Sequence, residues 1–360
     1  MTATGASAAR PVDAALVREL VAAATAAPSI HNTQPWRFRW AERAGVLTLC
    51  AAGGRRLSEA DPQGRALHVS AGAALFNLRV AALRHGLAPQ VGLLPGRDPR
   101  ALAEVRLAHG RVRMDGAGRP GLYEALWRRH SSRRPFTGAP VPAVVRTELS
   151  GAARAEGARL EFTAPEETAR LLALTREGER RNGAAAERAE ESRRWVEQGA
   201  HGGLFGLPPD GLGTRDTHER LPLRDFTAEE HGVGDGAGYG TGYGVEHGSG
   251  RAGERGAESF EEHPQLAVVR TRHDGPVDWL RAGQALERAL LQLTAEGLCA
   301  SLFHQALEWP DLRAALRGPV PPADRGMPRP PHVQMLLRIG YGSTRRSSLR
   351  APVEAVLEYE

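Results

Sequence analysis

Two stretches of this chain lie 211 residues apart and have closely related sequences, which constrains the fold more than any other feature. Residues 71–87 read AGAALFNLRVAALRHGL, and residues 282–298 read AGQALERALLQLTAEGL. Six pairs are identical at this fixed offset: Ala71/Ala282, Gly72/Gly283, Ala74/Ala285, Leu75/Leu286, Gly86/Gly297 and Leu87/Leu298. Both stretches have the apolar spacing of a helix and end in Gly-Leu, which is typical of a helix stop. This pattern favours a duplicated architecture.

A second, weaker pair supports the same interpretation. Residues 12–24 and 142–153 both predict short helices with Glu-Leu followed by small residues, and they precede the first pair in the same order. Two alternatives stay open at this point, because alanine-rich helices also resemble one another by chance.

Hydrophobic periodicity gives a coarse map of the elements. It predicts helices over 12–26, 65–85, 121–130, 142–156, 166–198, 277–297 and near 308–317. It predicts strands near 36–40, 46–50, 89–94, 103–107, 158–163, 265–270 and 333–339, with a further segment at 298–303. Helices alternate with single strands and hairpins rather than with regular strand–helix–strand units, so we expect an α+β fold.

Composition excludes several classes of protein. The 360 residues suit one large domain or two ordinary ones. All 47 basic side chains are arginines, and they are scattered among 42 acids, which disfavours a nucleic-acid binder. Only Cys50 and Cys299 are present, so we expect no disulfide framework, no metal site and a reducing cytoplasm. We find no signal peptide and no apolar run of membrane-spanning length, and therefore expect no membrane partner.

Residues 27–36, APSIHNTQPW, form an unusually polar loop between two apolar elements. Two prolines bracket it and prevent a helix from continuing through it. Its five hydrogen-bonding side chains are Ser29, His31, Asn32, Thr33 and Gln34. A loop of this kind presents donors and acceptors to a ligand. We interpret Trp36, at its end, as core packing.

Residues 128–134, RRHSSRR, combine four guanidinium groups with an imidazole and two hydroxyls just after a predicted helix. Arginine clamps phosphate with two hydrogen bonds, and serine hydroxyls complete an anion cradle. A run of arginines is also found on solvated surfaces. The interleaved serines and the apolar flanks favour a phosphate site.

Residues 200–262 are irregular. Between His231 and Ala257 there are 11 glycines in 27 residues, which indicates a mobile connection or a lid. The flanking segments 204–209 and 221–226 contain enough apolar side chains to pack on the body of the protein.

The polar loop resembles the Pro-Ser-x-x-Asn-x-Gln-Pro-Trp signature of the FMN-dependent nitroreductase family. The basic turn is similar to the family's Arg-x-Ser-x-Arg motif at Arg129, Ser131 and Arg133, and continues with Phe136 and Val141-Pro142. Gly340-Tyr341-Gly342 followed by Arg345, Arg346 and Arg350 resembles the family's C-terminal ending, and which of these arginines reaches the phosphate is left open.

The polar loop occurs only in the first half of the chain and the basic turn only in the second. This distribution resembles the Acg-like branch of the family, as do Asp61-x-x-Gly64-Arg65-Ala66-Leu67 and Asp278-Trp279-Leu280-x-Ala282-Gly283. The resemblance implies mixed, mainly antiparallel sheets flanked by helices. It also implies two fused halves, 1–118 and 119–360, that form a pseudo-dimer within the chain, with a lid or insertion at about 200–262.

The resemblance further implies one FMN site between the halves, with the flavin rather than a side chain as the catalytic group. Its cofactor-binding residues would be Pro28, Ser29, His31, Asn32, Gln34, Arg129, His130, Ser131, Arg133, His304, Gln305, Arg345, Arg346 and Arg350. His304 and Gln305 match the place where family members cover the flavin N5 side, often with an acidic residue. Either histidine, His31 or His304, is equally well interpreted as an interior histidine.

Two functions remain open. In the first, the protein is an oxidoreductase in which NAD(P)H reduces FMN and a nitro-aromatic, a quinone or another electron-poor small molecule accepts the electrons. In the second, the lid closes over the flavin, excludes the nicotinamide and makes the protein a flavin-sequestering carrier. The oligomeric state, monomer or homodimer, is left open.

Overall fold

The computed structural model describes residues 12–110, 117–200, 203–208, 211–226, 256–318, 330–343 and 348–360. Its helices are α1 (Ala14–Thr25), α2 (Arg65–Arg84), α3 (Leu122–Arg128), α4 (Ala143–Ala155), α5 (Pro165–Ala184), α6 (Ala186–Ala200), α7 (Pro276–Ala295) and α8 (Pro310–Ala315). Its strands are β1 (Trp36–Ala41), β2 (Val46–Ala51), β3 (Gln90–Leu93), β4 (Ala101–Arg106), β5 (Arg159–Phe162), β6 (Arg215–Asp216), β7 (Ala257–Glu258), β8 (Gln265–Thr271), β9 (Cys299–Phe303), β10 (His332–Gly340) and β11 (Leu357–Tyr359).

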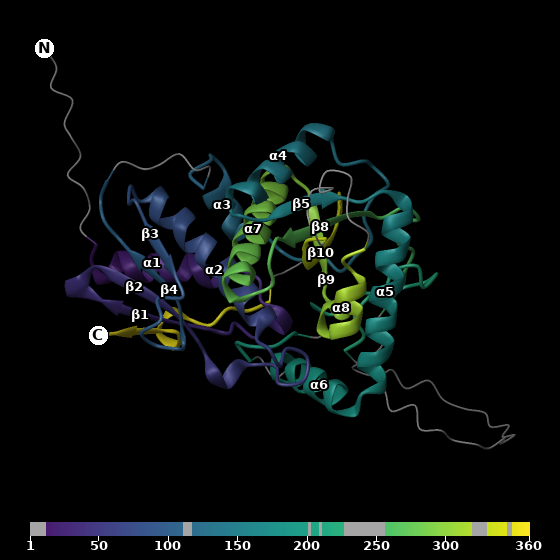
Figure 1. Ribbon diagram of the computed structural model, residues 1–360, viewed down its shortest axis with the longest axis horizontal. Helices are drawn as coiled ribbons and strands as arrows, with labels where there is room; N and C mark the ends of the chain where they lie inside the picture. Colours follow the sequence, from purple (N-terminus) through teal and green to yellow (C-terminus); the bar gives the residue numbers. More distant parts are fainter. Residues whose placement is uncertain are drawn as a thin grey trace, which may run out of the picture.

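Two sheets lie on either side of a central helix pair, α2 and α7 (Figure 1). The first has the order β11-β1-β2-β4-β3 and the second β5-β8-β10-β9. Adjacent strands are antiparallel in both sheets, except that β11 runs parallel to β1. The predicted α+β class with mainly antiparallel sheets is confirmed.

The two sheets share one topology when α2 is matched with α7. In each, two antiparallel strands come before the long helix and two after it, and the last strand lies second from the far edge. In each half a helix, α1 or α4, precedes the first strand of the sheet. This match supports the predicted duplication.

The crossing of α2 and α7 is close and reciprocal. A Cβ atom on Gly72 would lie 2.2 Å from the carbonyl oxygen of Leu280, and one on Gly283 would lie 2.0 Å from that of Val69. The offset of 211 residues relates Gly72 to Gly283 and Val69 to Leu280. An isologous interface about a two-fold axis has this contact pattern. It supports the proposed internal pseudo-dimer, whose halves would meet here.

Several expectations need correction. The predicted helix 166–198 is two helices, because Ala185 has an extended conformation between α5 and α6. The predicted helix near 308–317 begins at Pro310, which suits the first position of a new helix. The segment 298–303 is strand β9. The parallel edge strand β11 was not predicted, and it adds residues of the second half to the sheet of the first.

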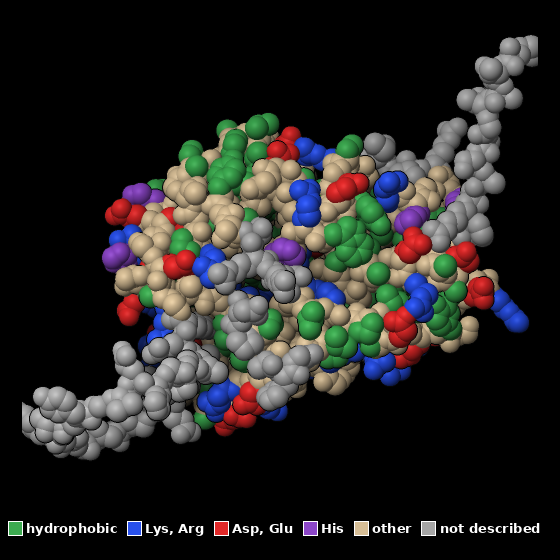
Figure 2. All heavy atoms as spheres, turned by 180° about the vertical axis from the view of Figure 1, so that it is seen from behind, with side chains coloured by type: hydrophobic (Ala, Val, Ile, Leu, Met, Phe, Trp, Pro, Cys, Tyr) green, Lys and Arg blue, Asp and Glu red, His purple; other side chains and the backbone are tan. Residues whose placement is uncertain are grey.

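The helix α2 is long and apolar enough to cross a membrane by length and composition, contrary to the expectation that no run reaches that length. The apolar stretch of α2 is 83% buried within the protein, as expected of a core helix. Both cysteines are free and buried, as their small number predicted. On the face shown in Figure 2, arginines and acids are interspersed and form no continuous basic area.

The segments expected to pack on the body do so where they are described. Phe226 is buried, and Phe205 lies under the guanidinium of Arg55 at 4.2 Å. Most of the glycine-rich stretch 231–257 lies outside the described residues, so its predicted mobility stays a prediction.

Candidate functional site

The polar loop between α1 and β1 has a strained backbone. His31, Asn32 and Gln34 all have positive φ angles, of 47°, 52° and 47°. This conformation is unfavourable for side chains with a Cβ atom, and it persists only where surrounding contacts impose it. Such strain is concentrated at functional sites.

Two side chains of the loop supply these contacts. The amide of Asn32 donates to the carbonyl of Gly206 at 2.9 Å. Gln34 donates to the carbonyl of Leu204 at 2.6 Å and accepts from the backbone N–H of Ala351 at 2.9 Å. The loop is therefore braced by the 203–208 segment and by the C-terminal segment of the chain.

The basic turn follows α3 and lies against β9. The backbone N–H of Ser132 donates to Ala300 at 2.8 Å, and Ser131 forms a β-bridge to the same residue. The turn is thereby fixed beside the polar loop, although about 100 residues separate the two in sequence.

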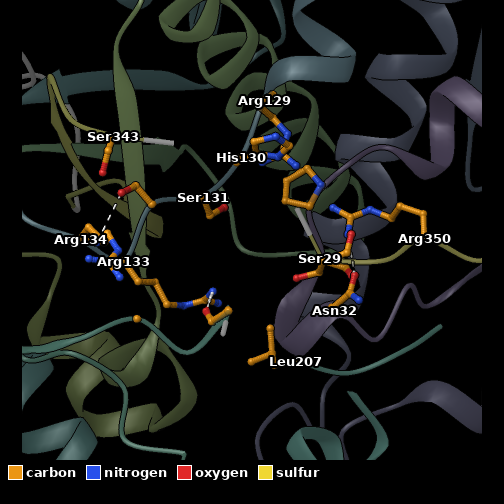
Figure 3. Close-up of a pocket in the computed structure, with 15 residues that line it drawn as sticks. Ser29, Asn32, Arg129, His130, Ser131, Arg133, Arg134, Leu207, Ser343 and Arg350 are labelled. Atoms are coloured by element: carbon orange, nitrogen blue, oxygen red, sulfur yellow. Dashed lines mark hydrogen bonds between the residues drawn. The ribbon is translucent and has the colours of Figure 1, made fainter. Parts of the chain in front are cut away.

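Together the loop and the turn line a basic pocket (Figure 3). Arg129, His130 and Arg350 lie on one side of it, Arg133, Arg134 and Ser343 on the other, and Ser131 between them. The lining residues are Pro28, Ser29, Asn32, Arg129, His130, Ser131, Ser132, Arg133, Arg134, Leu207, Gly211, Gly213, Ser343, Ser348 and Arg350. We call this the phosphate compartment.

Carboxylates oppose two of the four arginines in this compartment. Arg134 binds Glu258 through two hydrogen bonds of 2.8 and 3.0 Å. Arg129 lies 3.5 Å from Glu287, whose pKa burial raises to about 7 against the attraction of that guanidinium. Arg133 and Arg350 also line the compartment, and a cluster of guanidinium groups suits the dianion of a phosphate monoester.

Unsatisfied polar atoms indicate that the compartment is built for an anion. Arg129 Nη1, His130 Nδ1 and Arg350 Nε are buried without a hydrogen-bond partner among the described residues. Burial, followed by repulsion from Arg129, lowers the pKa of Arg350 to about 9. Buried donors of this kind are costly unless a ligand accepts their hydrogen bonds, and a phosphate supplies three acceptor oxygens.

A second pocket adjoins the first. It shares Pro28, Ser29, Ser131 and Arg133 with the phosphate compartment. The rest of its lining is mainly apolar and comes from the polar loop, α2, the 221–226 segment, α7, β9, the residue after β9, and β10: Ile30, His31, Arg65, Ala66, Val69, Ser70, Ala73, Phe226, Leu286, Ser301, Leu302, His304 and Met335. We call it the ring compartment.

Two histidines meet in the ring compartment. The rings of His31 and His304 are 5.7 Å apart, and Phe226 meets His31 edge-on at 5.3 Å. His304 Nδ1 lies 2.6 Å from a carboxylate oxygen of the buried Glu308. The same oxygen accepts from Arg224 at 2.5 Å.

Burial lowers the pKa of both histidines, and Arg224 contributes in the same direction. For His304 the hydrogen bond to Glu308 opposes this effect. Burial acts to raise the pKa of Glu308, but Arg224 and His304 outweigh it and lower this pKa to about 2. The two imidazoles are therefore neutral at pH 7 and the carboxylate is charged.

The structure brings together ten of the fourteen predicted site residues. Those that line one or both compartments are Pro28, Ser29, His31, Asn32, Arg129, His130, Ser131, Arg133, His304 and Arg350. Gln34 and Gln305 line neither: Gln34 braces the loop, and Gln305 donates to the carbonyl of Pro222 at 2.8 Å. Arg345 and Arg346 lie outside the described residues.

Sequence reasoning missed Arg65, Phe226 and Glu308. Arg65 belongs to a motif that was noted but not assigned to the site. Glu308 follows His304 by four residues, a spacing that places two side chains on one helical face and could have indicated the pair. Phe226 gave no local signal, because its place is set by long-range packing.

No family model matches the chain. Three Mycobacterium tuberculosis proteins are similar over nearly its whole length. Rv3131, provisionally named an NAD(P)H nitroreductase, is 28% identical over 91% of this chain and 86% of its own. The protein acg, also provisionally named an NAD(P)H nitroreductase, is 26% identical over 90% and 88%. The uncharacterised Rv3127 is 25% identical over 95% and 93%.

Among solved structures, the FMN- and NADPH-dependent nitroreductase NfnB of Sphigopyxis sp. strain HMH aligns with 66% of this chain and 98% of its own. The sequence identity is 16% and the TM-score is 0.38. The chain is therefore similar over nearly its whole length to two proteins that are provisionally named NAD(P)H nitroreductases, and it carries the polar loop and the basic turn that resemble the nitroreductase motifs.

Proposed function

We propose that the protein binds FMN and uses it to transfer electrons from NAD(P)H to a small electron-poor acceptor such as a nitro-aromatic or a quinone. The observation that carries this proposal is the junction of two unlike compartments. The phosphate compartment is lined by four arginines, and the apolar ring compartment shares four lining residues with it. FMN has the same division into a phosphate and an apolar ring.

The described residues fit the cofactor. Arg129, Arg133, Arg350 and the Ser131 turn would hold the phosphate, and α2, Leu286 and Met335 would pack against the ring. The bound flavin would accept a hydride from a nicotinamide and deliver electrons to the acceptor. The chain's own part is to orient the ring, exclude water and supply polar groups at its edge. One chain provides both compartments.

A second function, flavin sequestration, is supported by a different observation. Leu207 lines the phosphate compartment and Phe226 the ring compartment, and both belong to the segment predicted to form a lid. A lid that stays closed would deny a nicotinamide access to the ring.

Anaerobic absorbance titration of the purified protein tests both functions. If the first proposal is correct, the protein binds FMN, becomes yellow and is bleached by NADPH or NADH within seconds. Bleaching by dithionite but not by a nicotinamide would favour sequestration. A protein that takes up no FMN would contradict both.

The variant Arg133→Gln tests the site itself. Losing one charge-assisted phosphate contact corresponds to about 1.5–3 kcal/mol, so we expect FMN to bind roughly 10- to 100-fold more weakly. Riboflavin lacks the phosphate, and its affinity should change little. An equal loss for both ligands would mean that Arg133 does not contact the phosphate.

A further inference from the structure

We infer that His304, oriented by Glu308, gives a proton to the electron acceptor in the ring compartment. This role rests on the proposed function and assigns a side chain to a step in which the sequence suggested only the flavin. The geometry at the two ring nitrogens of His304 is the starting point.

The two nitrogens have different surroundings. Nδ1 faces Glu308 at 2.6 Å, and the carboxylate is an acceptor, so Nδ1 carries a hydrogen. Within the described part of the chain no hydrogen bond engages Nε2, while the imidazole lines the ring compartment. Nε2 is therefore the atom that can exchange a proton with an occupant.

Glu308 is held as a fixed anion behind the imidazole. Arg224 donates to one oxygen at 2.5 Å and Asn182 to the other at 2.9 Å. A carboxylate in this place fixes the ring orientation and stabilises the imidazolium form. We assign Glu308 as a positioning residue.

His31 provides a second imidazole beside the first. Both its nitrogens are buried and have no hydrogen-bond partner in the described part of the chain, and only 3% of the residue is exposed. The charged groups that act on the pair are Glu308 and the guanidiniums of Arg224, Arg65 and Arg133. Two imidazoles 5.7 Å apart among these cations cannot both be imidazolium ions at low cost, so the pair carries at most one positive charge.

For a quinone acceptor, the atoms and electrons of this step are conserved. The acceptor gains two electrons and one proton as a hydride equivalent from the reduced flavin. Before the step, His304 Nε2 takes a proton from solvent, which gives the imidazolium beside Glu308. The carbonyl oxygen of the acceptor then forms an O–H bond with that proton, and the Nε2–H bond breaks. The imidazole is left neutral on Glu308 and regains a proton from water.

The variant His304→Gln, compared with two acceptors, tests this role. Stopped-flow reoxidation of the NADPH-reduced protein by p-benzoquinone should slow at least tenfold, because a positioned proton donor contributes about 10²–10⁴-fold. Ferricyanide takes one electron and no proton, so its rate should stay within twofold. The control His68→Gln changes a histidine that lines neither compartment, and both rates should be unchanged.

The pH dependence gives a second readout. Because burial lowers the pKa of His304, its protonated form is lost as pH rises through a value below 6.5. The quinone rate of the wild type should therefore fall with rising pH across that range, and the dependence should be absent in His304→Gln. The ferricyanide rate should be flat in both proteins.

Other outcomes would overturn the inference. Equal slowing with both acceptors would mean that His304 holds the flavin, and no slowing with either would mean that it gives no proton. If the wild type reduces neither acceptor, the proposed function fails, but the histidine can still be examined. ¹⁵N NMR of the apoprotein should show the Nδ1–H tautomer of His304 and its loss in Glu308→Gln. The Nε2–H tautomer in the wild type would contradict the assignment.

Discussion

The ends of α1 and α4 occupy matching places in the two halves, and they differ in what they leave beside the α2–α7 crossing. After α1 the chain enters the polar loop, and the adjoining face of α2 lines the ring compartment through Ala66, Val69 and Ala73. After α4 comes Glu156, buried, which binds Arg79 at 2.5 Å and Arg288 at 2.8 Å. The side of the crossing next to the polar loop is therefore open to a ligand. The side next to α4 is filled by an ion cluster of Glu156, Arg79 and Arg288.

One pair of related positions illustrates this difference between the two sides of the crossing. The offset of 211 residues relates Ala73 to Gln284. Ala73 lines the cavity, whereas the side-chain oxygen of Gln284 accepts from Arg79 at 2.9 Å. Two related frameworks can therefore end as a binding site or as packed interior according to a few side chains at the crossing.

Removing the ion cluster should have the largest effect on stability. Glu156→Gln removes the charge of the buried carboxylate that Arg79 and Arg288 both bind, and breaking a buried pair costs about 3–5 kcal/mol. Urea unfolding should show this loss of free energy. Glu148→Gln is the matched control, because its ion pair with Arg119 is 39% exposed on both sides, and we expect less than about 1 kcal/mol. Similar losses in the two variants would contradict the role given to the cluster.

Replacing Ala73 of α2 by glutamine, the residue at the related position 284 of α7, should close the ring compartment. In Ala73→Gln the longer side chain extends into the cavity, and we expect FMN to bind at least about 30-fold more weakly, roughly 2 kcal/mol. Ala73→Ser adds only one oxygen and should bind FMN within a few-fold of the wild type. Fluorescence titration measures both, and unchanged binding by Ala73→Gln would place the ring elsewhere.

The crossing itself gives the smallest predicted effect. Gly72→Ala brings a methyl group against a backbone carbonyl and should destabilise the protein by about 1–3 kcal/mol. Gly283→Ala should do the same, and the double variant should lose less than the sum, because one separation of the helices relieves both clashes. Gly151→Ala in α4 is the control, since nothing lies near its added methyl group and alanine favours helix. Additive losses would argue against a reciprocal contact.

Much of the fold could be predicted from local pattern. The periodicity that gave α2 and α7 is a property of the segments themselves, and so is the alternation that gave β1 and β2. Strand β11 could not be predicted from sequence, because a strand of three residues shows no periodicity and forms only by pairing with β1. The break between α5 and α6 at Ala185 could not be predicted either, because the charged sequence pattern continues through it.

The candidate site also has a part that the sequence predicted and a part that it could not predict. The loop and the turn could be found because their chemistry is concentrated in a few consecutive residues. Which of their side chains face the ligand could not be read from sequence, because Gln34 turns toward Ala351, 317 residues away. Arg224 and Glu308 meet across 84 residues, and neither stands in a motif that predicts the other.

The brace on the polar loop has a consequence for biosynthesis. Asn32 and Gln34 depend on backbone groups of residues 349 and 351, which a ribosome adds 317 residues later. At about 5–20 residues per second, this interval lasts roughly 15–60 s. During that time the first sheet lacks its parallel edge strand, and Asn32 and Gln34 lack their C-terminal partners. The nascent chain therefore cannot complete its ligand site by folding one half at a time, and this site is among the last parts of the molecule to form.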